Sequence, residues 1–210
     1  MDGTAMDAPG LVLRTPDGRP YRFDPGALCL ELLLTGGPGR YAYWEVLHDP
    51  DALTDWAAAS RLAPGLRLTV TGPEVAAARA LRDALWTLAE ARAHGRPAVG
   101  EDEAVAVVNA AAAEPPLVAR IEPDGTRGWV PGATGGQLLS TVARDAVDLL
   151  TGPFADRLRV CGADDCALLF VDTSRPGRRR WCAMENCGNR HKVRAHRARH
   201  SGGGEQCPQD

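Results

Sequence analysis

Four cysteines near the C-terminal end form two pairs, with four residues inside each pair and fifteen between the pairs: Cys161 and Cys166, then Cys182 and Cys187. Each pair can present two thiolates to one ion from a tight turn, and the segment between them is long enough for a hairpin. The spacing therefore predicts a four-cysteine finger around one structural Zn²⁺. Iron in a rubredoxin-like site is the alternative.

The other two cysteines have different surroundings. Cys29 lies in the apolar run Ala27–Leu34 and is expected to be a small buried hydrophobe. Cys207 lies in the polar tail, residues 201–210, which is expected to be disordered. Neither is predicted to bind the metal.

The first ten residues carry neither a basic segment nor an apolar segment of the kind found in a secretory signal. No apolar stretch is long enough for a membrane span. We therefore expect a cytoplasmic, reducing location, where paired cysteines bind metal more often than they form disulfides.

Charge divides the chain into two unlike parts. Residues 157–200 carry ten arginines and one lysine against four acidic residues, a formal charge of +7, whereas the rest of the chain stands at −10. Four thiolates with one Zn²⁺ would leave about +5 on this segment. Such a basic module is drawn toward polyanions, so DNA is the expected partner.

The part before the cysteines mixes helices and hairpins. Helices are expected at 27–34, 52–60, 72–94, 101–113 and 137–150, from apolar spacing and from caps such as Asp49-Pro50 and Thr71-Gly72-Pro73-Glu74. Hairpins are expected around Pro16-Asp17-Gly18 and Pro123-Asp124-Gly125. The predicted class is α+β.

The cysteine module is expected to be treble-clef-like. Its predicted parts are a knuckle at 161–166, a hairpin of strands 167–171 and 178–182, and a helix from about Gly188 to His200. The sequence Thr151-Gly152-Pro153 is expected to end the preceding helix, which places a domain boundary near 152–158. The domains are therefore predicted as 1–154, 155–200 and the tail.

These residues resemble a known family. The segments Cys187-Gly188-Asn189-Arg190, Phe170 to Ser174 and Arg179 to Cys182 look like the CGNR zinc finger of bacterial proteins. The preceding part resembles the ABATE domain that accompanies this finger, through Leu30 to Thr35, Leu47 to Trp56, Ala80-Leu81-Arg82 and Asn109. The resemblance implies a zinc-binding, stress-related transcription regulator that uses the finger on DNA.

The predicted finger helix carries a basic stripe, because Arg190, Arg194 and Arg197 recur at helical spacing. The predicted nucleic-acid contacts are Arg178, Arg179, Arg180, Asn189, Arg190, Lys192, Arg194 and Arg197. A solvated basic face is the plain alternative. Asn189 and Arg190 have a second interpretation, in which they hydrogen-bond the thiolate sulfurs or cap the hairpin.

No enzyme is predicted. Four thiolates leave no open position on a tetrahedral zinc, and the body lacks nucleophile-elbow, P-loop and dinucleotide motifs. The acidic body would sense a small-molecule or protein signal, or form a homodimer. In the alternative, the finger binds RNA or an acidic protein; the module's two aromatic residues, Phe170 and Trp181, are expected to be buried, which favours duplex DNA over single-stranded RNA.

Overall fold

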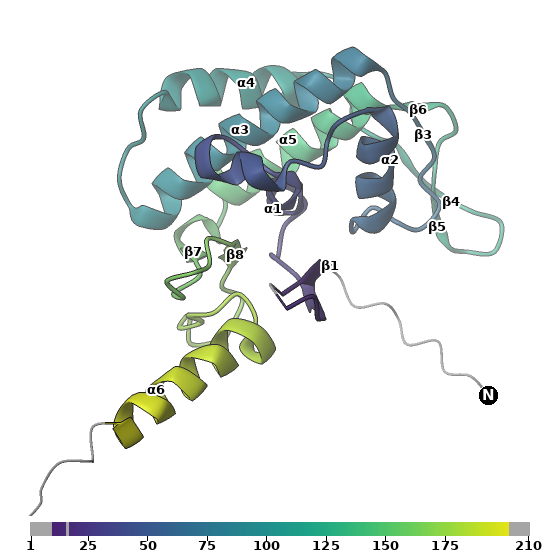
Figure 1. Cartoon of the computed structure of the whole chain (residues 1–210). Helices are drawn as coiled ribbons and strands as arrows, with labels where there is room; N and C mark the ends of the chain where they lie inside the picture. Colours follow the sequence, from purple (N-terminus) through teal and green to yellow (C-terminus); the bar gives the residue numbers. More distant parts are fainter. Residues whose placement is uncertain (1–9, 16, 202–210) are drawn as a thin grey trace, which may run out of the picture.

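In the computed structural model, which describes residues 10–15 and 17–201, a layer of helices lies above a smaller C-terminal unit (Figure 1). The three long helices of this layer pack against one another: α3 (Gly72–His94), α4 (Glu101–Ala113) and α5 (Gly135–Thr151). Two shorter helices pack against these three: α1 (Leu28–Leu32) on α5, and α2 (Pro50–Ala59) on α3. The α+β class is confirmed.

Helices α2 and α3 begin at the caps that the sequence predicts. The Asp49 side chain accepts a hydrogen bond from the Ala52 backbone at the start of α2. Thr71 and Glu74 form a capping box at the start of α3, and Gly95 ends that helix in the left-handed conformation that glycine adopts without strain. The predicted caps are therefore confirmed.

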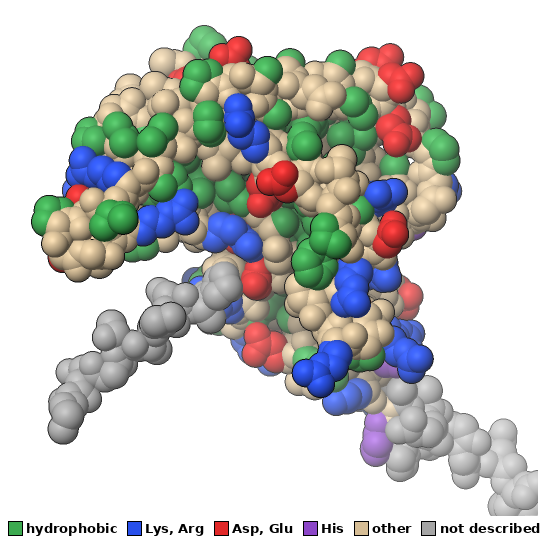
Figure 2. Space-filling view, turned by 180° about the vertical axis from the view of Figure 1, so that it is seen from behind, with side chains coloured by type: hydrophobic (Ala, Val, Ile, Leu, Met, Phe, Trp, Pro, Cys, Tyr) green, Lys and Arg blue, Asp and Glu red, His purple; other side chains and the backbone are tan. Residues whose placement is uncertain are grey.

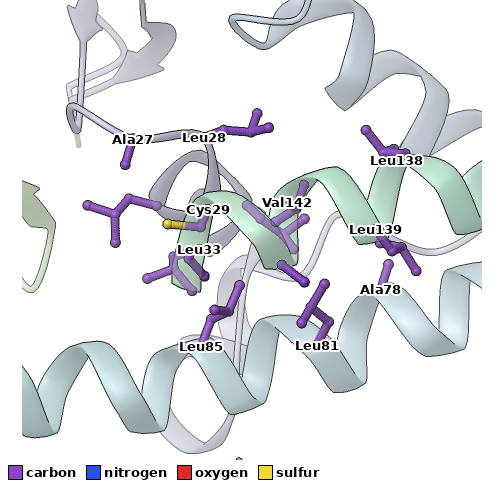
Figure 3. Close-up of a cluster of buried hydrophobic side chains, with 14 of the residues drawn as sticks. Ala27, Leu28, Cys29, Leu33, Ala78, Leu81, Leu85, Leu138, Leu139 and Val142 are labelled. Carbon is purple, nitrogen blue, oxygen red and sulfur yellow. The ribbon is translucent and has the colours of Figure 1, made fainter. Parts of the chain in front are cut away.

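The core lies where α1, α3 and α5 meet, and Figure 3 shows their side chains pointing toward one another. Leu81, Leu138 and Val142 are almost completely buried there. Cys29 is buried in the same cluster, so its predicted role as a small hydrophobe is confirmed. Trp56 also packs here and donates its indole N–H to the Glu31 carbonyl at 3.2 Å.

The strands are short and pair two by two. The N-terminal hairpin pairs β1 (Leu11–Arg14) with β2 (Pro20–Phe23), and a second hairpin pairs β4 (Ala119–Ile121) with β5 (Arg127–Trp129). Both hairpins were predicted. A parallel pair between β3 (Leu68–Thr69) and β6 (Ala133–Thr134) was not. Three short 3₁₀-helices lie between these elements: η1 (Leu33–Thr35), η2 (Gly39–Trp44) and η3 (Ala155–Arg157).

The C-terminal unit contains one antiparallel hairpin, of β7 (Leu158–Val160) and β8 (Leu169–Val171). The predicted pairing was wrong, because β8 pairs with the strand before the first cysteine pair and 178–182 forms no strand. A π-helical turn (Met184–Gly188) then leads into α6 (Asn189–Ser201). Knuckle, hairpin and helix keep the treble-clef-like arrangement.

The N-terminal hairpin lies against the C-terminal unit, although the whole helical body separates them in sequence. Phe23 is only 1% exposed and packs in one cluster with Phe170 and the cysteine side chains, with Leu13 and Tyr21 at its edge. The predicted domain division remains a prediction. Of the predicted tail, Ser201 ends α6, and residues 202–210 with Cys207 lie outside the described residues.

Candidate metal centre

The four predicted ligand cysteines converge on one point, with their sulfur atoms all within 4.8 Å of one another. The Cys182 sulfur is 3.7 Å from that of Cys166 and 3.5 Å from that of Cys187. Sulfur ligands about 2.3 Å from a tetrahedral Zn²⁺ would lie about 3.8 Å apart. The cluster therefore fits one structural Zn²⁺.

Local structure brings the two pairs together. Cys161 and Cys166 lie in the loop that joins β7 to β8, and a hydrogen bond of 2.9 Å from the Cys161 amide to the Leu168 carbonyl closes that loop. The Cys182 amide lies 3.4 Å from the Cys161 sulfur, as a donor to a thiolate would. Cys187 sits in the π-helical turn just before α6, so an ion bound by the four cysteines would tie the helix to the hairpin.

Hydrogen bonds among the four thiols shift their pKa values in opposite directions. Hydrogen bonds from Cys166 and Cys182 lower the pKa of Cys161 far below that of an ordinary thiol. The pKa of Cys182 is raised, first by its hydrogen bonds with Cys161 and Cys166 and then by burial. Four thiolates packed this closely need a bound cation to stay ionised together.

Arg190 connects the cysteine cluster to Asp165 in the knuckle, residues 161–166. Its guanidinium donates to the Cys187 sulfur at 3.2 Å and to the Asp165 carboxylate at 3.1 Å. Arg194, one turn along α6, donates to the same carboxylate at 3.0 Å. Burial alone would lower the pKa of Arg190, but the hydrogen bond to Cys187 and the charge of Asp165 outweigh it and raise that pKa. Arg190 thus has the thiolate-binding geometry of the second interpretation, while Asn189 donates to the Glu185 carbonyl instead.

Asp172 explains why the predicted return strand does not form. Its carboxylate is buried and accepts hydrogen bonds from the amides of Ser174, at 3.0 Å, and Arg179, at 2.9 Å. Burial would raise the pKa of Asp172, but the hydrogen bond from the Ser174 hydroxyl, at 2.6 Å, and those from the two amides hold it below its usual value. The segment after β8 is therefore a loop wrapped around one carboxylate, which takes the amide of Arg179 away from any strand ladder.

Arg179 is held inside this loop. Its guanidinium lies 4.4 Å from the centre of the Phe170 ring and donates to the carbonyls of Trp181, at 3.0 Å, and Cys182. Phe170 is completely buried, as expected, whereas Trp181 is half-buried and contacts His191 in a tilted ring pair, with 4.7 Å between ring centres. Trp181 is therefore less buried than predicted.

The eight predicted nucleic-acid contacts fall into two groups. Arg179 and Arg190 are half-buried and bind the finger's own backbone, sulfur or carboxylate groups. The other six side chains are exposed on the loop before Trp181 or on α6: Arg178, Arg180, Asn189, Lys192, Arg194 and Arg197. Figure 2 shows Lys and Arg side chains gathered at the lower end of the molecule, beside the histidines.

Two buried ion pairs in the body were not predicted. Arg82 is 2% exposed and binds both carboxylate oxygens of Glu45, at 2.9 and 2.8 Å. Burial would raise the pKa of Glu45, but Arg82 lowers it. Glu31 is completely buried, which raises its pKa although Arg61 donates to it at 2.9 Å.

A signal for both was present in the sequence. Glu31 is the charged residue within the apolar run 27–34, and Arg82 shares the buried face of α3 with Ala78 and Leu85.

Among the described helices, none has both the length and the apolar composition that crossing a membrane requires.

Comparison with known proteins agrees with this architecture. The model of the ABATE family, described as a putative stress-induced transcription regulator, matches residues 26–153. The CGNR zinc-finger model matches residues 157–200, which contain all four clustered cysteines. No curated protein matches the chain.

Proposed function

The chain belongs to the ABATE family and ends in a CGNR zinc finger, and we propose that it is a zinc-dependent, DNA-binding transcription regulator. The four clustered cysteines would hold the zinc. The finger would contact DNA, and the acidic body would sense a signal or form a homodimer.

The observation that carries the proposal is the exposed positive charge on the unit that the metal holds together. Six of the predicted contact side chains are exposed on the finger, and Asp165 holds Arg194 in position on α6. Ordered arginines on a rigid helix can bind phosphates or guanine edges in a major groove. Residues 1–156 carry 13 basic and 21 acidic residues, a formal charge of −8, which favours contact through the finger, because DNA repels the rest of the molecule.

A second candidate is a finger that binds RNA or an acidic protein surface. Trp181 favours it to some extent, because part of its ring is exposed. That ring already contacts His191 in a tilted pair and has Arg180 above it at 5.2 Å, so a base would have to compete with both side chains. Duplex DNA therefore remains the preferred partner.

A salt titration of DNA binding tests the proposal. The double change Arg194→Ala and Arg197→Ala should remove two phosphate contacts. The slope of log K against log salt should then become less steep by about 1.8, which corresponds to about sixtyfold lower affinity at 0.1 M salt. Arg120→Ala, on strand β4 of the body, is the matched control. Equal affinity of the double variant and the control would contradict the proposal.

A further inference from the structure

The N-terminal hairpin and α6 face each other across a groove of about 510 Å³. Thr15, Arg19 and Tyr21 line it from the hairpin side, and Asn189, Arg194 and Arg197 are among the residues that line it from α6. Neither family match includes residues 11–23, so no known role covers the hairpin wall.

The hairpin is firmly attached to the finger. Phe23 inserts into the cluster formed by Phe170 and the cysteines, and Tyr21 is half-buried beside it. The turn itself is closed by the Thr15 amide, which donates to the Arg19 carbonyl at 2.9 Å, and by the Arg19 amide, which donates to the Thr15 hydroxyl at 3.0 Å. The two walls of the groove therefore belong to one packed unit.

The groove is strongly basic. Four arginines line it, Arg19, Arg190, Arg194 and Arg197, against a single acidic lining residue, Glu185. The Arg19 side chain is 76% exposed. Its ion pair with Asp17, at 2.7 Å, is exposed and therefore contributes little to stability. A phosphate group can replace the Asp17 carboxylate as the partner of Arg19.

We propose that this groove binds the phosphate backbone of duplex DNA, with Arg19 of the hairpin as a contact opposite α6. This inference rests on the proposed function and extends it to a second element. The lining offers cations rather than stacking surfaces, since its aromatic residue, Tyr21, is half-buried against the finger. A lone finger makes a small interface with DNA, and the hairpin enlarges it.

Fluorescence anisotropy on the full-length, zinc-loaded protein tests the groove, with a labelled duplex of mixed sequence. Arg19→Ala should reduce the salt slope by about 0.9 and the affinity by about eightfold at 0.1 M salt. The matched control is Arg22→Ala, on the same hairpin but lining the separate cleft beside α2, and it should leave the affinity unchanged. Asp17→Asn should strengthen binding, since it removes the competing carboxylate.

The outcomes separate this inference from the proposed function. If Arg194→Ala weakens binding and Arg19→Ala does not, the finger binds DNA but the groove assignment is wrong. If neither variant weakens binding, the proposed function fails as well. If Arg19→Ala weakens binding of a single-stranded RNA of the same sequence but not of the duplex, the assignment to duplex DNA is overturned.

Discussion

Replacing Phe23 with alanine tests whether the N-terminal hairpin is part of the folded finger. The ring is 1% exposed and packs with Phe170, Cys161, Cys182 and Cys187. Truncating a buried phenylalanine to alanine costs about 3–5 kcal/mol. The lost contacts are those with the cysteine cluster, so the substitution should destabilise the zinc-bound state of the finger.

Because a four-cysteine finger folds as it binds its metal, a loss of folding energy appears as a loss of zinc affinity. At the lower end of the range, 3 kcal/mol, Phe23→Ala should weaken zinc binding by about a hundredfold. Competition with a chromogenic chelator measures this directly, and circular dichroism reports whether the helical body stays folded.

Val12→Ala is the matched control, because Val12 lies on the same hairpin and is 61% exposed. An exposed substitution of this kind should change stability by less than about 0.5 kcal/mol. If the two variants bind zinc equally well, the hairpin does not contribute to the folding of the finger, and the packing argument is refuted.

Three further changes have expected outcomes. Glu45→Gln should destabilise the body by about 3 kcal/mol in urea at neutral pH, because it removes the carboxylate that binds the buried Arg82 guanidinium through both oxygens and leaves the longer contact to the Asp83 carboxylate, at 3.2 Å. The pKa of Glu45 is lowered in the folded state, so its stabilisation is present above about pH 4.3 and lost as the pH falls below that value; the gap to wild type should then close, and a gap that persists would contradict the ion-pair reasoning. Arg190→Met should weaken zinc binding by about ten- to a hundredfold in chelator competition, through the lost hydrogen bond to Cys187, and an unchanged affinity would show that the bond is incidental. Asp172→Ala should lower the thermal stability of the zinc-bound finger by about 1–3 kcal/mol, because two backbone amides lose their acceptor, and an unchanged melting temperature would reject this role.

The body could be predicted where its signals are local. The Asp49 cap, the capping box of Thr71 and Glu74, and the apolar spacing of α3 and α5 each depend on residues within a turn or two of one another. These signals defined the helices to within a few residues. Cysteine spacing is equally local within each pair, and it predicted a cluster that the folded chain brings together.

The features that were missed depend on contacts between distant segments. The strand expected at 178–182 gave way to β7 because the Asp172 carboxylate binds the amides of the following loop. The pair of β3 and β6 spans only two residues on each side, which is too short for a periodic pattern. Charged residues are usually exposed, so the burial of Glu31 and Arg82 depends on partners from distant segments, Arg61 and Glu45.

The central claim is that zinc holds a DNA-binding surface together. The most direct test is elemental analysis of the purified protein, combined with a duplex-DNA titration before and after chelation. The account predicts one zinc per chain and DNA binding that is lost on chelation and restored when zinc is added back. One zinc per chain with no DNA binding in either state would contradict it and favour a finger that binds another macromolecule.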